Sequence, residues 1–174
     1  MTAGPRLILI GLRASGKSTL GAMLADRIGA TFVDLDDRTA GALNAASCAE
    51  ALKERGEQRF RAVEAETLKS ALAETGTILA LGGGTPTAPG AAELLRESDS
   101  PVAYLHASPA DLAARLERTD IDSRPSLTGR GTVEEIAELY GERDPLYREL
   151  AARVIETADL DLDRILGELE SMLA

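Results

Sequence analysis

The segment GLRASGKS at residues 11–18 constrains this chain more than any other part of its sequence. It matches the pattern G-x-x-x-x-G-K-[ST], in which glycines let backbone N–H groups turn toward phosphates, Lys17 adds a full charge, and the Ser18 hydroxyl ligates Mg²⁺. An apolar run, Arg6–Ile10, precedes the motif, and a helical pattern, Lys17–Ile28, follows it. The sequence therefore predicts a strand, a phosphate-binding loop and a helix whose N-terminus faces the phosphates of a nucleotide.

The rest of the chain alternates short apolar runs with longer stretches of helical spacing. Its 174 residues, 44% of them apolar, fit one domain with a single core. Strands that alternate with helices are typical of a parallel sheet covered on both faces. We expect a doubly wound α/β fold with strands at Arg6–Ile10, Thr31–Leu35, Thr77–Leu81, Val102–His106 and Arg153–Glu156. Helices are expected over Lys17–Ile28, Cys48–Arg55, Glu57–Glu74, Ala91–Glu97, Pro109–Arg118, Val133–Ala151 and Leu162–Leu173.

Charge and composition exclude several classes of partner. The chain has 29 acidic and 19 basic residues, so its net charge of -10 repels nucleic acids and anionic membrane surfaces. Any bound anion must meet local cations, and Lys17 is one of only three lysines. The longest apolar runs are too short for a membrane-spanning helix. The single cysteine, Cys48, excludes an internal disulfide, and no signal peptide pattern is present, so we expect a cytoplasmic protein. A monomer is the default expectation.

Two aspartates are the candidates for the carboxylate of a metal site. The apolar run Thr77–Leu81 leads into the glycines 82–84 and offers no carboxylate of its own. Asp34 and Asp36 stand instead at the carboxyl end of the second predicted strand, where ligands bind in open α/β sheets. Because the two aspartates are two positions apart, the carboxylate of one can face a metal while the carboxylate of the other faces another ligand. The alternative is an acidic turn or an N-cap for the next helix, above all for Asp37.

These motifs, in this order, resemble those of the shikimate kinase family. The resemblance rests on the phosphate-binding loop, Asp34-x-Asp36, GEQRFR at 56–61 with Glu64, glycines 82–84, Arg124-Pro125, and RDPLY at 143–147. It covers about residues 6 to 158, and it implies a P-loop NTPase fold of the nucleoside monophosphate kinase type, a five-stranded parallel sheet in the order 2-3-1-4-5 flanked by helices. It also implies one domain over residues 1–174, with a substrate-binding segment at about 37–64 and a lid at about 119–131. That last stretch has no regular periodicity, and its length is typical of a functional loop.

The resemblance implies that the chain transfers the γ-phosphate of ATP to the 3-hydroxyl of shikimate, giving shikimate 3-phosphate. Shikimate carries a carboxylate, which suits guanidinium groups, and hydroxyls, which suit a carboxylate acceptor. The resemblance assigns Arg61 and Arg143 to the carboxylate, with Glu64 holding Arg61 by an i,i+3 pair. It also implies that Asp36 binds the hydroxyls and takes the proton of the attacking 3-hydroxyl, and that Gly83 offers its backbone N–H to the substrate.

The same resemblance implies the groups that bind ATP and Mg²⁺. Asp34, through water, and Ser18 would hold Mg²⁺, while Lys17 and Arg124 would neutralise the transferring phosphoryl group. Arg118 would lie against the adenine. The expected nucleotide-binding residues are Ala14, Ser15, Gly16, Lys17, Ser18, Thr19, Arg118 and Arg124.

Several positions depart from the pattern of the family. Ala14 stands where a glycine is usual, which leaves the requirements of the phosphate-binding loop intact. Cys48 and Leu52 stand where isoleucine and phenylalanine are often found, so the pocket for the substrate ring is expected to be looser. His106, at the end of an apolar run, is interpreted as a structural polar cap of its strand.

Other functions remain open at this point. A kinase of another hydroxylated carboxylate, such as gluconate, would also use a pair of arginines. A ligand-sensing domain could keep the phosphate-binding loop without catalysis, although the retention of Lys17, Asp36 and Arg124 together argues against it. A nucleoside monophosphate kinase is disfavoured, because Asp34-x-Asp36 and the triple glycine suit a small ring better than a second base.

Overall fold

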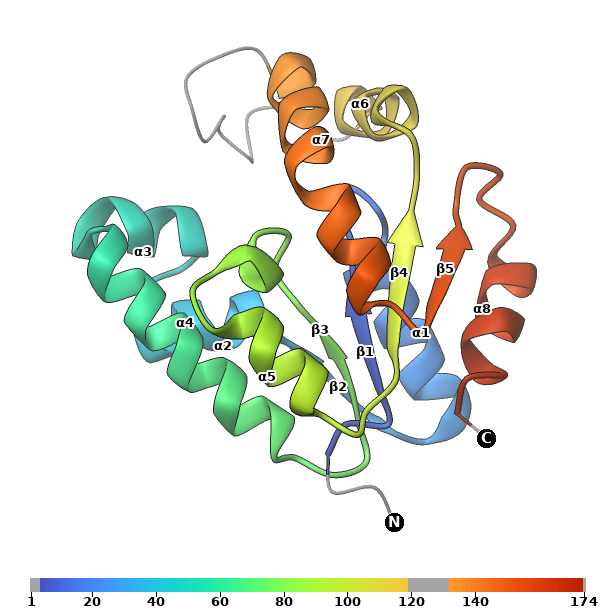
Figure 1. Cartoon of the computed structure of the whole chain (residues 1–174), viewed down its shortest axis with the longest axis horizontal. Coiled ribbons are helices and arrows are strands. Elements are labelled where there is room, and N and C mark those ends of the chain that lie inside the picture. The colour runs from blue at the N-terminus through green and yellow to red at the C-terminus, as the bar shows by residue number, and fades with distance from the viewer. Residues whose placement is uncertain (1–3, 119–131, 174) are drawn as a thin grey trace.

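The computed structural model describes residues 4–118 and 132–173. Within them, five parallel strands form one sheet in the order β2-β3-β1-β4-β5 (Figure 1). The strands are β1 (Leu7–Ile10), β2 (Thr31–Asp34), β3 (Thr77–Ala80), β4 (Val102–His106) and β5 (Arg153–Glu156). The predicted fold class and strand order are confirmed, and each observed strand lies within its predicted range.

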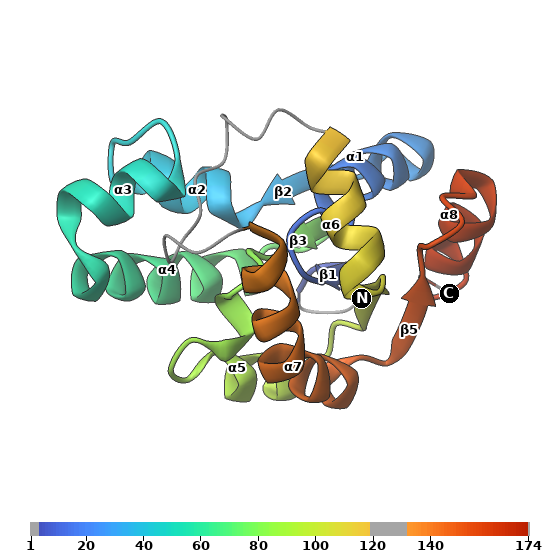
Figure 2. The same cartoon turned by 90° about the horizontal axis from the view of Figure 1, so that it is seen from above.

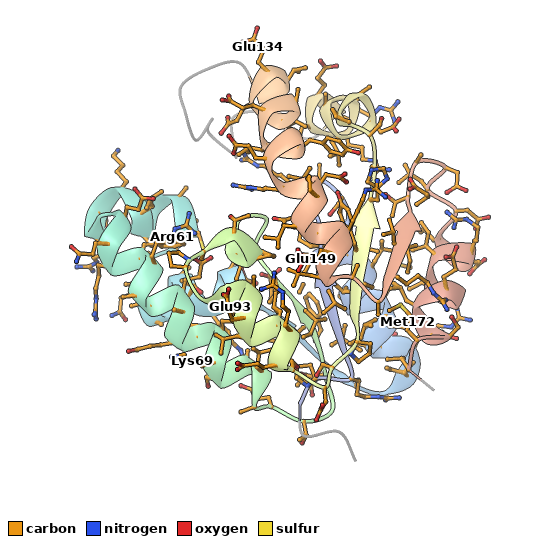
Figure 3. The ribbon with its side chains drawn as sticks, in the orientation of Figure 1. Arg61, Lys69, Glu93, Glu134, Glu149 and Met172 are labelled. Carbon is orange, nitrogen blue, oxygen red and sulfur yellow. The ribbon has the colours of Figure 1, made fainter. Side chains whose placement is uncertain are left out.

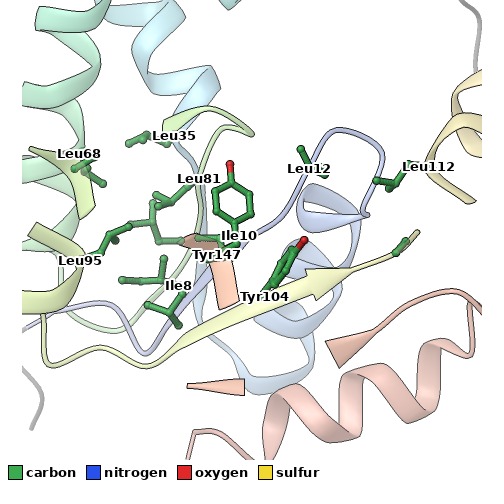
Figure 4. Packing of buried hydrophobic residues seen from close by; sticks show 14 of the residues in the cluster. Ile8, Ile10, Leu12, Leu35, Leu68, Leu81, Leu95, Tyr104, Leu112 and Tyr147 are labelled. Atoms are coloured by element: carbon green, nitrogen blue, oxygen red, sulfur yellow. The ribbon is translucent and has the colours of Figure 1, made fainter. Parts of the chain in front are cut away.

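The two faces of the sheet carry separate cores, because successive side chains of a strand point to opposite faces. Leu7 and Leu9 of β1 pack with α1 (Lys17–Ile28) and α8 (Leu162–Glu170). Ile8 and Ile10 belong to the other core, whose larger members include Tyr104 (Figure 4). That core also takes side chains from α4 (Glu57–Leu72), α5 (Ala91–Glu97), α6 (Pro109–Arg118) and α7 (Thr132–Leu150).

A third, smaller core lies among the helices that follow β2. It is formed by Leu43, Ala51, Phe60 and Val63, which come from the region of α2 (Leu35–Ala42), α3 (Cys48–Arg55) and the first turns of α4. In both views these helices lie at the opposite end of the molecule from α8 (Figures 1 and 2). The segment that the sequence analysis expected to bind substrate, at about 37–64, therefore has a small core of its own.

Helix α2 was not expected from the sequence, because Leu35 continues the apolar run of β2. In the structure the strand ends at Asp34, which is the N-cap of α2. The carboxylate of Asp34 accepts a hydrogen bond from the backbone N–H of Asp36 (3.0 Å), as a capping aspartate does. Asp36 is thus a residue of the first helical turn and not of a strand end. A 3₁₀ turn over Thr85–Thr87 was also missed.

The expected lid at about 119–131, with Arg124, lies outside the described residues. Among the helices that the structure describes, none is long and apolar enough to cross a membrane. Helices α4 and α8 end at Leu72 and Glu170, earlier than the sequence pattern indicates.

The close approach of α1 to β2 generates the first testable prediction. A Cβ added to Gly21 would lie 2.5 Å from a ring carbon of Phe32 and 3.1 Å from Leu9. We expect Gly21→Ala to lower the free energy of unfolding by about 1 to 3 kcal/mol through overpacking, although alanine favours helices.

Gly167→Ala in α8 is the matched control, because no atom lies within 4 Å of the Cβ added there. This change should raise the free energy of unfolding by up to about 1 kcal/mol, the difference in helix propensity. Urea unfolding followed by circular dichroism measures both variants. Effects of the same sign would contradict the proposed contact between α1 and β2.

Candidate active site

The loop between β1 and α1 has the geometry of a phosphate cradle. A Cβ on Gly11 would lie 2.6 Å from Ser15 Oγ and 2.7 Å from the carbonyl oxygen of Leu105, so only glycine fits. Gly16 has a φ of 93°, a region that glycine adopts without a steric penalty. The loop conformation therefore requires glycine at both ends of the motif.

The middle of the loop holds a residue under backbone strain. Ala14 has a φ of 66°, which costs a residue with a Cβ about 1 to 2 kcal/mol. Lys17 donates hydrogen bonds from Nζ to the carbonyl oxygens of Gly11 (2.7 Å) and Leu12 (3.0 Å). Its charge consequently lies at the loop, where the phosphates of a nucleotide would be held.

Asp34 joins this loop to the end of β2. Its Oδ2 accepts a hydrogen bond from the Ser18 hydroxyl (2.6 Å), while its Oδ1 caps α2 at the N–H of Asp36. Mg²⁺ prefers oxygen ligands, and in nucleotide sites one or two carboxylates usually suffice because phosphates and waters complete the shell. The described residues hold no cluster of three or more acidic, histidine or cysteine side chains that could bind a metal alone. Ser18 and Asp34 therefore fit a metal that arrives with a nucleotide.

Asp36 lies beside the glycines that follow β3. A Cβ on Gly82 would lie 2.3 Å from Asp36 Oδ1, so the carboxylate packs against the glycine backbone. The side chain keeps access to solvent, yet the protein atoms around the carboxylate desolvate it and raise its pKa. The charge of Asp34 raises the pKa further, and Lys17 opposes this shift. A carboxylate with a raised pKa is a stronger proton acceptor.

The glycine segment is held by two side chains from α7. Arg143 donates from Nη1 to the carbonyl oxygen of Gly83 (2.8 Å), and the Tyr147 hydroxyl donates to the same oxygen. Burial raises the pKa of Tyr147 to about 12, which keeps the hydroxyl protonated as a donor. A Cβ on Gly83 would meet no protein atom closer than 3.5 Å, so within the protein Gly82 is the more crowded position.

Arg61 projects from α4, near the end of that helix that lies beside α3 (Figure 3). Its Nη1 donates to Glu64 Oε2 (2.7 Å), which confirms the i,i+3 pair expected from the sequence. The Glu64 carboxylate is almost fully buried, whereas about a third of the Arg61 side chain is exposed. Part of the Arg61 side chain is therefore accessible to a ligand.

Arg115 is a functional candidate that sequence reasoning missed. It donates to the carbonyl oxygen of Ala14 (3.3 Å) and to the side chain (3.2 Å) and carbonyl of Thr157, and burial lowers its pKa. Arg118, the expected adenine contact, is exposed at the end of α6. Arg115 thus links the phosphate-binding loop to the segment after β5. The observation that could have indicated Arg115 is that β1, β4 and β5 are adjacent parallel strands, so the segments that follow them meet at one edge of the sheet.

The structure also bears on the sequence-based expectations for His106 and Cys48. His106 lies 2.7 Å from Glu156 Oε2 and 2.8 Å from the Tyr140 hydroxyl, so it joins β4 to β5 and α7, which agrees with a structural role. Cys48 is half-buried and lies next to Leu52 in the small helical core. Its Sγ donates to the backbone carbonyl of Asp36 (3.2 Å), which places the thiol beside the proposed substrate site.

The described residues converge at the carboxyl edge of the sheet. Lys17 and Ser18 follow β1, Asp34 ends β2 and Asp36 lies just after it, and the glycines follow β3 and contact Arg143. The arrangement pairs an anion cradle and the oxygen atoms of Ser18 and Asp34 with the Asp36 carboxylate and two guanidinium groups. Chemically, it suits the transfer of a phosphoryl group from a nucleotide to a hydroxyl of a small carboxylate.

Comparisons with known proteins identify the type of protein that carries such a site. The family model described as "Shikimate kinase" matches residues 13–174. A shikimate kinase of Nitratidesulfovibrio vulgaris is 40% identical over 172 residues, 97% of this chain and 95% of that protein. The structure of shikimate kinase from Acinetobacter baumannii in complex with shikimate has a TM-score of 0.82 and 31% identity, covering 98% of this chain and 95% of that one. A gluconokinase from Sinorhizobium meliloti, at 17% identity and a TM-score of 0.60, shares the fold alone.

The environment of Cys48 generates the second prediction. Burial, followed by the nearby charge of Asp36, raises the pKa of the thiol to about 12. Since only the thiolate reacts, we expect iodoacetamide to alkylate the folded chain at about pH 8 some hundred- to thousandfold more slowly than an exposed model thiol.

The rate should also rise roughly tenfold for each pH unit between about pH 8 and pH 10, without the plateau of a normal thiol. Because Cys48 is the single cysteine of the sequence, all alkylation that is measured occurs at this residue. The same chain unfolded in urea is the control. A folded-state rate equal to that of the model thiol would contradict the burial of Cys48.

Proposed function

This chain belongs to the shikimate kinase family, and we propose that the residues gathered at its sheet edge bind ATP and shikimate and transfer the γ-phosphate to the 3-hydroxyl. The chain is an ATP-dependent kinase whose product is shikimate 3-phosphate. The observation that carries the assignment of its residues is the double use of Asp34. One oxygen meets Ser18 of the phosphate-binding loop and the other caps the helix that carries Asp36. The donor side and the acceptor side of the reaction are thereby joined.

On the donor side, Lys17 and the N-terminus of α1 bind the phosphates of ATP. The backbone of Ala14, Ser15 and Gly16 forms the cradle, with Ser18 and Thr19 at the start of α1. Ser18 and Asp34 would hold Mg²⁺, which neutralises charge on the phosphates when bound. Lys17 stabilises the negative charge that develops on the transferring group.

On the acceptor side, Arg61 and Arg143 bind the carboxylate of shikimate, and the backbone N–H of Gly83 contacts the substrate. Asp36 accepts the proton of the shikimate 3-hydroxyl while the oxygen of that hydroxyl forms the new bond to the γ-phosphorus. The bond between the γ-phosphorus and the bridging oxygen breaks, and ADP leaves with that oxygen. The raised pKa of Asp36, caused first by desolvation, suits it to take this proton.

The remaining assignments extend the same proposal. Arg124 neutralises the transferring group, and closure of the segment at about 119–131, proposed as a lid, excludes water. Arg118 contacts the adenine, and Arg115 holds the phosphate-binding loop against Thr157. The chain works as a single domain over residues 1–174, with the segment at about 37–64 binding substrate, as a cytoplasmic monomer.

The third prediction concerns substrate and phosphate chemistry. Release of ADP should depend on Mg²⁺ and rise with shikimate, but not with gluconate or a nucleoside monophosphate, in a coupled spectrophotometric assay. Lys17→Ala should lower kcat by about 10²-fold or more, because it removes a full charge from the transferring group. Lys69→Ala, a change at an exposed position of α4 outside the proposed substrate-binding segment, is the control and should leave kcat unchanged.

A rise with gluconate in place of shikimate would contradict the substrate assignment while retaining the kinase class. Near wild-type turnover by Lys17→Ala would contradict the role of the lysine.

The fourth prediction separates the two aspartates. Asp36→Asn should keep ATP binding and lower kcat by about 10²- to 10⁴-fold, because it removes the proton acceptor. Asp34→Asn keeps an oxygen that can cap α2 but loses the charge, so the Mg²⁺ concentration for half-maximal rate should rise by about 10- to 100-fold.

Asp26→Asn, at an exposed position of α1 outside the proposed substrate-binding segment, is the control and should change neither quantity. Titration of Mg²⁺ for each variant at saturating shikimate distinguishes the two effects. Exchanged phenotypes would show that the roles of Asp34 and Asp36 are reversed.

A further inference from the structure

The hydroxyl of Thr85 makes a long-range contact that no sequence motif indicates. Thr85 is buried, at 1% exposure, and begins the 3₁₀ turn after the glycine segment. Its Oγ1 donates a hydrogen bond to Oε1 of Glu64 on α4 (2.8 Å). The other oxygen of the same carboxylate, Oε2, accepts from Arg61 (2.7 Å). A chain of two hydrogen bonds therefore runs from Thr85 to Arg61.

We propose that Thr85 is a positioning residue for shikimate, acting through Glu64 on the guanidinium of Arg61. This inference rests on the proposed function of the site and concerns a residue that the substrate does not need to touch. The hydroxyl fixes the Glu64 carboxylate about its last torsion, so that Oε2 faces Arg61. A carboxylate held at both oxygens leaves Arg61 fewer orientations, and less conformational entropy is lost when it binds a ligand.

The contact differs from what threonine hydroxyls do elsewhere in the described helices. Thr39 and Thr67 donate to the carbonyl of the residue four positions earlier, and Thr87 donates to Gly84 within its own turn. Those bonds are local, and such bonds to the backbone are common in helices and turns. Thr85 instead spans 21 positions to reach a buried carboxylate.

The same short segment also holds the second guanidinium of the proposed carboxylate site. The carbonyl of Gly83 accepts a hydrogen bond from Arg143, and two positions later Thr85 reaches Arg61 through Glu64. Figures 1 and 2 show this segment, between β3 and α5, lying between α4 and α7. Residues 83–85 thus set the separation of two guanidinium groups that approach from different helices.

The segment is also registered against Asp36. A Cβ on Gly82 would lie 2.3 Å from Asp36 Oδ1 and 2.9 Å from Thr85 Oγ1, so both oxygens pack against one glycine. The backbone N–H of Thr85 donates to the carbonyl of Gly82 (3.1 Å). A shift of Thr85 would therefore disturb the position of the arginine relative to the proposed base.

The test compares three variants of Thr85 with a matched control. Thr85→Val keeps the shape and removes the hydroxyl, Thr85→Ala removes it without added bulk, and Thr85→Ser retains it. We expect Val and Ala to raise KM for shikimate about tenfold, the size of one hydrogen bond to a charged group, with KM for ATP within about twofold of wild type. Thr85→Ser should restore KM for shikimate.

Thr67→Val, which loses a local hydroxyl on α4, is the control and should leave both KM values unchanged. A positioning role also predicts that Thr85→Val adds less than about twofold to KM for shikimate when Arg61 is already alanine, because the path ends at that residue. Isothermal calorimetry with shikimate should show the same dependence, and thermal unfolding by circular dichroism establishes that each variant is folded.

The outcomes separate this inference from the proposed function. If wild type does not phosphorylate shikimate, the proposed function is wrong. If wild type does so but Thr85→Val and Thr85→Ala bind shikimate normally, the inference is overturned. Equal rises in both KM values, or full additivity with Arg61→Ala, would also overturn it and assign Thr85 to general stability.

Discussion

The carboxylate of Asp34 is the contact on which the rest of the site depends. β2 and β1 are not neighbours in the sheet, because β3 lies between them. Ser18, which follows β1, nevertheless reaches Asp34 at 2.6 Å. This is possible because α1 crosses the face of the sheet toward β2, where Gly21 leaves room for the Phe32 ring. A packing detail in the core therefore sets the distance between the phosphate-binding loop and the acidic end of β2.

From that point, the sheet edge arranges the acceptor side. The cap on α2 fixes the backbone of Asp36, and β3 ends next to β2, with Asp34 paired to Ala80. The glycine segment after β3 then lies against Asp36, and its Gly83 carbonyl accepts a hydrogen bond from Arg143 of α7. In a chain with a net charge of -10, cations placed in this way give two anionic substrates a local region of favourable potential.

The sequence was most informative where structure is determined locally. The phosphate-binding loop, the five strands and the ends of α1 and α3 were all predictable, because glycine positions, apolar runs and capping residues act over short distances. The order of the strands was implied by the resemblance to the shikimate kinase family and not by these local patterns. Helix α2 was not, since Leu35 extends the apolar run of β2 and the aspartates suit a turn as well as a cap. Arg115 and Thr85 were missed because their partners, Thr157 and Glu64, lie 42 and 21 positions away. The roles of the site residues remain predictions, drawn from resemblance and now supported by geometry.

The most direct measurement is a crystal structure of the protein with ADP, Mg²⁺ and shikimate. We expect a ring hydroxyl of shikimate within hydrogen-bond distance of Asp36, the shikimate carboxylate against Arg61 and Arg143, and the metal beside Ser18 and Asp34. The hydroxyl held by Asp36 should be the one nearest the terminal phosphate. A shikimate carboxylate bound at Lys17, or an Asp36 carboxylate that contacts no hydroxyl, would contradict the account.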